Sequence, residues 1–566
     1  MATIHDKGPG YSKEDDGPHL DIVASQDHEV GSVITSSHEY SLHRRLGNRQ
    51  LQIIAIGGAI GTANFVSIGT ALAAGGPGSL FLAFLFYAGI MGLVNNCAAE
   101  MVVHMPISGG FVRLAGHWVD DAWGFMAGWN FFFYEGFLIP FEITALNVVL
   151  SFWTDKIPAV AVCLVCIFLY GLLNIFAVRF YGEVEFWLSG GKILLLFLLF
   201  GFTFVTMVGG NPQHDSYGFR FWNNPGAFAE TRSTGSLGRF EGFLKCIWTA
   251  AFTIVGPELV SMTAAEAKHP RIYIKNAYKS VYWRFFIFFV GSALCAGIVV
   301  AYNDPTLVGI INGDLGGSGT ASASPYVIAM QNMKISILPH IVSALLCTSI
   351  FSAGNNLVFC GTRTLYGLAL QGRAPKMLAK CTKSGVPVFA FGVTMLFPFL
   401  SLLSLSNGSS QALQWLINII TGGGIIDFVV ICVTYTSFYR AHKAQGISRD
   451  YLPYKGWFQP YSGYIALILE TMIVLVYGYT SFSPWNTANF FTYYSMLIID
   501  IVLFLFWKFY KKTTWLKPRD VDLVWQSDLL SAYESTVDEP VTTFWGEMLD
   551  LVRFWKWIPN RNEKDV

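Results

Sequence analysis

The chain has few charged residues for its length. Asp, Glu, Lys and Arg make up 13% of its 566 residues, whereas a typical soluble domain has about 25%. The 37 basic and 37 acidic residues give a formal net charge of zero, so the composition lacks the excess positive charge by which proteins bind nucleic acid. We therefore expect neither an ordinary soluble domain nor a nucleic-acid partner.

Motifs for catalysis, metals and nucleotides are also missing. Among the nine cysteines, Cys163 and Cys166 share one helix face, but no second Cys or His pair lies nearby to complete a zinc or redox site. The glycine-rich run 421–424 lacks the lysine of a phosphate-binding loop, and we interpret it as a helix interruption. Residues 1–47 are too polar for a cleavable signal peptide. We expect no enzyme, no metal and no cofactor.

Long apolar segments dominate the rest of the sequence. Hydrophobic residues make up 53% of the chain and aromatic residues 16%, which is typical of lipid-facing helices with interfacial aromatic belts. A helix needs roughly 20 largely apolar residues to cross a bilayer. The sequence therefore predicts an all-α polytopic membrane protein with about twelve transmembrane spans, at 51–74, 79–103, 123–152, 158–177, 187–209, 244–263, 283–302, 337–360, 386–406, 412–438, 462–482 and 489–510.

The basic residues predict how these spans are oriented. Arginines and lysines concentrate before span one, after spans six, eight and ten, and at the end of span twelve, whereas the loops after spans one, nine and eleven contain none. Because basic loops stay in the cytoplasm, we expect both tails there: a disordered 1–47 and a segment 513–566, flanking a transmembrane domain at 48–512. Arg284 is counted with the cytoplasmic cations after span six, and Asn407 forms a glycosylation sequon on the outer face.

Two of the apolar segments are interrupted near their middle. The first break is Gly57-Gly58-Ala59-Ile60-Gly61-Thr62 and the second covers 252–258, FTIVGPE. Unwound backbone at membrane depth is tolerated only where it lines a cavity or is buried in protein. Paired interruptions in the two halves of a polytopic protein indicate the binding site of a transporter. The alternative is that the glycines of the first break only allow close helix packing.

Short runs along the chain carry a resemblance to a known family: GGAIGT (57–62), PISGGF (106–111), GWN (128–130), PFEITA (140–145), YGEVEFW (181–187), GPEL (256–259), EAKHPR (266–271), SPYV (324–327), RAPK (373–376), GVP (385–387) and LPYK (452–455). The chain resembles the fungal amino-acid permeases of the amino acid–polyamine–organocation superfamily, and its region 443–461 is similar to the dicarboxylic and broad-range branches. The resemblance implies two inverted five-helix repeats, about 51–209 and about 244–438, with helices 1 and 6 broken. Two additional helices at 462–510 and proton-coupled uptake are also implied.

Broken helices suit a substrate that carries one carboxylate and one ammonium. A half-helix N-terminus presents free N–H groups to an anion, the ends of the other halves present free carbonyls to a cation, and glycine allows close approach to the backbone. The carboxylate-side candidates are Gly58, Ala59, Ile60, Gly61, Thr62 and Ala63. The candidates for the ammonium and side-chain pocket are Phe252, Thr253, Ile254 and Gly256.

Ionisable residues within the spans are candidates for proton coupling, because such groups are costly in a membrane and usually mark ion or proton paths. Glu258 is favoured since it adjoins the second break. Lys192 has the alternative of a snorkelling side chain that reaches the interface, and Glu142 that of a hydrogen bond that only holds span three in place. Asp427 in span ten is the fourth candidate. At the cytoplasmic ends, inner-gate ion pairs are expected from Glu266, Arg271, Arg113 and Arg363.

The function that the resemblance implies is import of L-amino acids with protons across the plasma membrane of a fungus. A broad neutral range is favoured over a dicarboxylic one, because the spans offer several carboxylates and only Lys192 as counter-charge. The dicarboxylic alternative stays open. A non-transporting sensor on the same fold is an alternative of another class, but such sensors have longer N-terminal extensions. The expected partners are an amino acid, protons, the lipid bilayer, and ubiquitin ligase or trafficking factors at the tails.

Overall fold

The computed structural model describes residues 47–49, 51–52, 60–154, 156–176, 181–312, 324–382, 386–403, 405, 409–537, 541–543 and 546. Apart from an isolated bridge between Phe482 and Trp485, the regular structure of these residues is helical. The expectations for Gly57, Gly58, Ala59 and Asn407, and for most of both tails, concern residues outside the described ranges.

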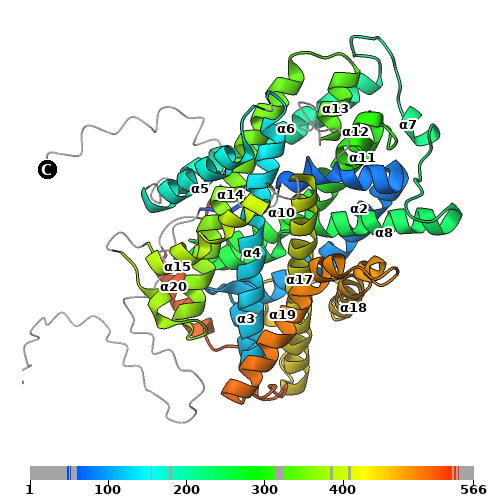
Figure 1. The fold of residues 1–566 in the computed structure, drawn as a ribbon. Coiled ribbons are helices and arrows are strands. Elements are labelled where there is room, and N and C mark those ends of the chain that lie inside the picture. Colours follow the sequence, from blue (N-terminus) through cyan, green and yellow to red (C-terminus); the bar gives the residue numbers. More distant parts are fainter. Residues whose placement is uncertain are drawn as a thin grey trace, which may run out of the picture.

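The longer helices correspond to the expected spans (Figure 1) and are α2 (Ser67–His104), α4 (Asp121–Leu150), α5 (Ala159–Phe176), α6 (Tyr181–Met207), α8 (Gly235–Thr253), α10 (Pro270–Arg284), α11 (Gly291–Val299), α14 (Leu338–Leu370), α15 (Val388–Thr394), α17 (Ser409–Gln445), α18 (Tyr461–Val476) and α19 (Thr487–Lys511). The shorter ones are η1 (Thr62–Asn64), α3 (Gly110–Trp118), α7 (Arg220–Asn223), α9 (Pro257–Thr263), η2 (Ala264–Glu266), the π-helix η3 (Phe285–Val290), α12 (Pro305–Asn312), α13 (Pro325–Asn332), η5 (Lys376–Ala379), η6 (Phe397–Leu403), η7 (Arg449–Tyr451), η8 (Tyr477–Ser481) and α20 (Ser527–Thr536).

The helices confirm the fold class. In the described part of the chain, 9 segments are long and apolar enough to cross a membrane, and two shorter apolar helices cover Ala159–Ile175 and Val388–Leu403. The first long segment, Thr62–His104, contains the second half of span one as well as span two. The two meet at Gly76, whose φ of 77° and ψ of 170° leave the helical region and require glycine. With that segment divided, the helices match the twelve expected spans.

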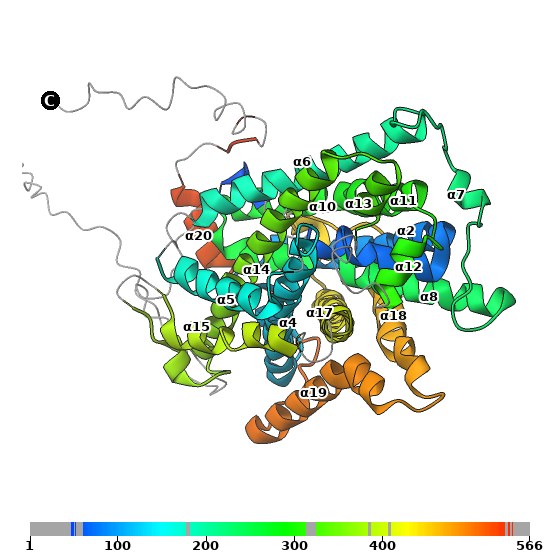
Figure 2. The same ribbon diagram turned by 45° about the horizontal axis from the view of Figure 1, so that its top comes forward.

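Helix α17 lies at the centre of the bundle. Figure 2 looks nearly along its axis and shows α4 beside it, with α18 and α19 at the edge of the molecule. The run 421–424 does not interrupt α17, which is continuous through it, so that expectation was wrong. A Cβ on Gly424 would lie 3.1 Å from Tyr134 of α4, and one on Gly423 would lie 3.2 Å from Met496 of α19. The glycines serve close helix packing, as small residues commonly do in membranes.

Candidate functional site at the two helix breaks

The second break is a real interruption of the helix. Helix α8 ends at Thr253 and α9 begins at Pro257, and the backbone between them is not helical. Ile254 has φ −92° and ψ 92°, and Gly256 has φ 144° and ψ −31°. A φ of this sign is readily adopted only by glycine. Gly256 is therefore the residue that allows the chain to leave α8 and start α9 within one span.

A buried glutamate caps the second half of the break. Glu258 is 1% exposed, and both of its carboxyl oxygens accept a hydrogen bond from the backbone N–H of Gly256 at 3.0 Å. This N–H is one of the donors that a helix start leaves without an intrahelical partner. The side chain of Glu258 thus belongs to the break itself, as its sequence position suggested.

Arg284 of α10 forms a hydrogen bond to the backbone on the α8 side of the break. Its side chain is 2% exposed, and Nη2 donates a hydrogen bond to the carbonyl oxygen of Val255 at 2.7 Å. The guanidinium lies directly against Gly256, where an added Cβ would be 1.8 Å from Nη2. Nε and Nη1 of Arg284 are buried without a hydrogen-bond partner among the described residues. The π-helix η3 starts at the next residue, and such segments are frequent at functional sites.

The prediction that Arg284 is a cytoplasmic loop cation was wrong. Helix α10 already begins at Pro270, so Arg284 lies inside the span and at the depth of the second break. Because the first turns of α10 are polar, a hydropathy count places the start of this span too late in the sequence. The signal that was available is the sequence Arg284-Phe285-Phe286-Ile287-Phe288-Phe289, an arginine at the start of an aromatic run with no nearby acid.

The described half of the first break is also non-helical. Gly61 is extended, with φ −98° and ψ −177°, and η1 follows it. The hydroxyl of Thr62 donates a hydrogen bond to the carboxylate of Glu142 on α4. A Cβ on Gly61 would lie 3.8 Å from Oε1 of Glu142. A second buried glutamate therefore contacts this break, and it comes from another span.

Lys192 of α6 lies near Glu142. Its side chain is 2% exposed, and its charge interacts with the carboxyl group of Glu142. A snorkelling lysine extends its ammonium to the protein surface, whereas Lys192 is enclosed by protein. The structure thus gives each break a buried acid and a buried base: Glu142 with Lys192, and Glu258 with Arg284.

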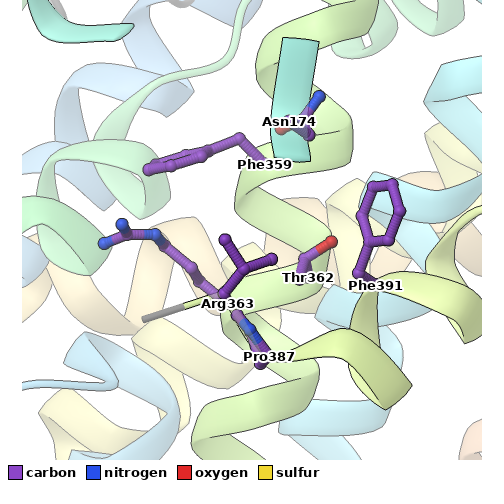
Figure 3. Close-up of a pocket in the computed structure, with 7 residues that line it drawn as sticks. Asn174, Phe359, Thr362, Arg363, Pro387 and Phe391 are labelled. Atoms are coloured by element: carbon purple, nitrogen blue, oxygen red, sulfur yellow. The ribbon is translucent and has the colours of Figure 1, made fainter. Parts of the chain in front are cut away.

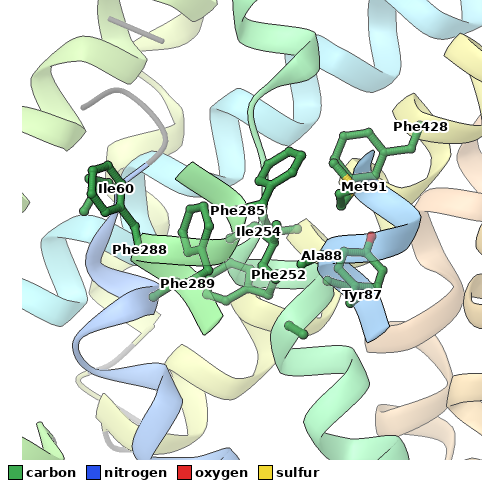
Figure 4. Close-up of a cluster of buried hydrophobic side chains, with 14 of the residues drawn as sticks. Ile60, Tyr87, Ala88, Met91, Phe252, Ile254, Phe285, Phe288, Phe289 and Phe428 are labelled. Carbon is green, nitrogen blue, oxygen red and sulfur yellow. The ribbon is translucent and has the colours of Figure 1, made fainter. Parts of the chain in front are cut away.

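Apolar side chains from both breaks meet in one cluster. Figure 4 shows Ile60 beside Phe288, and Phe252 and Ile254 close to the neighbouring phenylalanines of the π-helix. Phe141 of α4 packs edge-on against Phe252, with ring centroids 5.1 Å apart. Ile60, Phe252 and Ile254 thus belong to one buried apolar cluster. The hydroxyl of Thr253 is used within its own helix and donates to the Thr249 carbonyl at 2.7 Å, and Ala63 is buried at 8% exposure.

Among the described residues, no hydrogen bond joins Asp427 to either break. It is fully buried on α17 and accepts a hydrogen bond from Nδ2 of Asn130 on α4 at 2.9 Å. Other buried acids in the described part of the chain were not among the predicted candidates. Glu135 accepts from Thr364 at 2.8 Å and Glu470 from Tyr87 at 3.2 Å, and the oxygens of Asp500 lack a hydrogen-bond partner among the described residues. These acids face neighbouring helices, so packing decides their surroundings.

The expected inner-gate pairs are partly present. Arg363 pairs with Glu266 at 3.4 Å and lies 4.0 Å over the ring of Phe359. Figure 3 shows Arg363 and Phe359 at a pocket of about 300 Å³ that is also lined by Asn174, Thr362, Val386, Pro387 and Phe391. The other two arginines contact the C-terminal segment instead: Arg271 pairs with Glu534 at 3.0 Å, and Arg113 lies 4.8 Å over Trp525.

A polytopic helical bundle with two interrupted spans, each in contact with a buried glutamate, defines a membrane transporter of the broken-helix class. The family model "Amino acid permease" matches residues 50–518. The chain belongs to the amino acid permease family, and it is a transporter of amino acids rather than an enzyme.

Relatives in this family differ in specificity. The chain is 45% identical to the general amino acid permease AGP2 of Saccharomyces cerevisiae, over 86% of this chain and 84% of the relative. It is 36% identical to a proline-specific permease of Emericella nidulans (91% and 93% covered) and 35% identical to the dicarboxylic amino acid permease of Saccharomyces cerevisiae (85% and 79% covered). A solved manganese transporter of Eremococcus coleocola has the same fold, with a TM-score of 0.52 at 14% identity over 82% of this chain and 94% of that chain.

Proposed function

We propose that the protein imports L-amino acids together with protons across the plasma membrane, with a broad neutral range. One observation carries the coupling: a buried glutamate is hydrogen-bonded to each break, Glu142 to Thr62 and Glu258 to Gly256. Intramembrane carboxylates of this kind typically serve proton transfer. A carboxyl group that gains or loses a proton changes its hydrogen bonds to the break, which links the geometry of the binding segment to protonation.

The neutral range is supported by what surrounds the breaks. The side chains there are largely apolar and aromatic, including Phe141, Phe252 and Ile254, all buried. The two buried cations each have an acidic neighbour, since Lys192 interacts with Glu142 and Arg284 with Glu258. Neither is left to neutralise an acidic substrate side chain, so the dicarboxylic specificity of one relative is the second candidate.

Two described residues next to the tails lie together, because Nδ2 of Asn48 donates to the carbonyl of Thr542 at 3.1 Å. We place these residues in the cytoplasm, where the loops rich in Lys and Arg belong. Ubiquitin ligase or trafficking factors would then have access to the tails.

Uptake of labelled amino acids in a permease-deficient yeast tests this function. Uptake should increase as the external pH falls, collapse with a protonophore and not require sodium. Competition by unlabelled leucine, phenylalanine or alanine should exceed that by aspartate and glutamate. Stronger competition by the two acidic amino acids would replace the neutral range by the dicarboxylic one. Sodium-dependent uptake that survives the protonophore would overturn the coupling, and surface expression without any uptake would favour a sensor.

A further inference from the structure

An open groove lies at the basic end of the bundle, between the end of α17 and the start of α18. It has about 990 Å³ of empty volume, and its walls include Tyr439, Arg440, Lys443, Tyr461, Tyr464 and Pro518. We propose that this groove binds the phosphate headgroup of an anionic phospholipid in the cytoplasmic leaflet. Basic pockets between transmembrane helices on the cytoplasmic side are a common form of headgroup site.

The charge of the groove is available to a ligand. Arg440 and Lys443 are exposed and three residues apart on α17, so they project from the same face of the helix. Among the described residues no carboxylate forms an ion pair with either of them, whereas Arg449 on the following loop pairs with Glu100 at 2.6 Å. Two neighbouring cations without a protein counter-ion attract a phosphate, which accepts hydrogen bonds from both.

The aromatic side chains fit the same ligand. Tyr461 is 62% exposed and Tyr464 is 40% exposed, both on the first turns of α18. Exposed tyrosines at a membrane boundary lie at the level of the headgroups, with the ring toward the acyl chains and the hydroxyl toward water. They supply phenol donors beside the two cations.

The depth of the groove is that of the headgroups. Arg440 lies about 13 residues after Asp427, which is about 20 Å along the helix at 1.5 Å per residue. Half of a hydrocarbon core is about 15 Å thick. With Asp427 near the middle of its span, Arg440 and Lys443 are beyond the hydrocarbon and within the headgroup layer.

The helix next to the groove offers a path for acyl chains. Ile465, Ile468 and Met472 on α18 are 40%, 59% and 54% exposed, and their spacing places them on one face of the helix. Helix α18 lies at the edge of the bundle (Figure 2), so this face meets lipid. A basic headgroup pocket continuous with an apolar strip fits a whole phospholipid better than free phosphate.

The test compares lipid retention by matched variants. Full-length protein is reconstituted in phosphatidylcholine nanodiscs that contain a minority of phosphatidylinositol, extracted in mild detergent and analysed by native mass spectrometry. The variant is Arg440→Gln with Lys443→Gln. Its control is Lys376→Gln with Lys380→Gln, which removes the same charge from two exposed cations of another loop at the basic end. We expect the variant to lose at least about fivefold of the retained phosphatidylinositol, and the control to retain it.

Further measurements distinguish a phospholipid from other occupants of the groove. Arg440→Lys with Lys443→Arg keeps the charge and should restore retention, and Tyr461→Ala should reduce it. Inorganic phosphate at millimolar concentration should not displace the lipid; if it does, the groove is a phosphate site and the proposal is overturned. Equal retention by the variant and the wild type, or equal loss in the variant and the control, also overturns it. So does a wild-type dimer that Arg440→Gln with Lys443→Gln dissociates, because a second copy then occupies the groove.

Discussion

The guanidinium of Arg284 donates a hydrogen bond to the carbonyl oxygen of Val255 across 2.7 Å. The carbonyl is free because the helix of span six is broken, and the arginine comes from span seven. On the opposite side of Gly256, the carboxylate of Glu258 accepts from the backbone N–H. Side chains from both sides thus replace the helical hydrogen bonds that the break removes, and they carry opposite charges.

We expect Arg284→Met to abolish transport with the protein still at the cell surface. The change leaves the Val255 carbonyl and the Glu258 carboxylate without their cation. Losing a buried hydrogen bond to a charged group costs about 1.5–3 kcal/mol, which corresponds to about tenfold to a hundredfold in an equilibrium. The measurement is initial uptake normalised to surface protein. Arg284→Lys should recover part of the uptake rate with a shifted pH profile. An unchanged pH profile in both variants would mean that Arg284 contributes only to packing.

Gly256→Ala should be far more damaging than an alanine placed elsewhere in the spans. Gly256 has φ 144°, and its Cβ would lie 1.8 Å from Nη2 of Arg284. Backbone strain of this kind costs of order 1–3 kcal/mol, and the arginine is displaced as well. Gly201→Ala is the control, because nothing lies within 4 Å of its Cβ. Melting temperature in detergent and uptake should both fall for the first variant only.

At the first break, the size of the side chain at position 61 should decide whether uptake is retained. Gly61→Ala adds a Cβ at an ordinary contact distance of 3.8 Å from Glu142, so the protein should fold and retain measurable uptake. Gly61→Val adds a branched side chain where the substrate carboxylate is proposed to meet the backbone, and uptake should disappear without loss of surface expression. Unchanged apparent affinity in the valine variant would remove span one from the binding site.

Lys192→Met should uncouple accumulation from pH. Lys192 is buried and interacts with Glu142, and the proposed binding segment offers backbone groups to the substrate. We therefore expect exchange of labelled for unlabelled amino acid to continue, while concentration against a gradient is lost. Uptake into reconstituted vesicles with an imposed pH gradient distinguishes exchange from concentration against a gradient. Normal pH-driven accumulation would leave the carboxylates as the only coupling candidates.

Docking of the C-terminal segment should weaken in acid. The ring of His117 on α3 lies 4.0 Å from that of Trp525, and burial lowers the pKa of His117 from 6.5 to about 4, with Asp522 opposing the shift and Arg113 and Arg373 adding to it. The undocked histidine thus binds a proton more readily. Docking is strongest above about pH 6.5 and weakens as the pH falls toward about 4. Proteolysis within 513–537 should increase between pH 7 and pH 5, and His117→Phe should reduce that increase, with His104 still in contact with the Leu523 carbonyl.

Much of the fold was predictable because lipid imposes a simple rule on the sequence. Each span needs a sustained apolar run, and a hydropathy count finds such runs without knowing which helix packs on which. The second break was equally visible, since glycine followed by proline stops a helix wherever it occurs. The interpretation of 421–424 as a helix interruption was wrong, because glycines there bring α17 close to α4 and α19. A glycine that breaks a helix and one that allows close packing cannot be told apart from the sequence alone.

The sequence by itself determined the membrane class, the approximate positions of the spans apart from the start of span seven, and the residues at which span six must unwind, because hydropathy and backbone propensity are local properties. Only the tertiary structure decided that Glu142 contacts Thr62, that Lys192 is enclosed beside it, and that Arg284 turns inward to Val255. A charged group inside a membrane must find a partner, and that partner is supplied by whichever helix packs alongside. Residues far apart in the chain become neighbours only through helix packing, so no local pattern identifies the pairs.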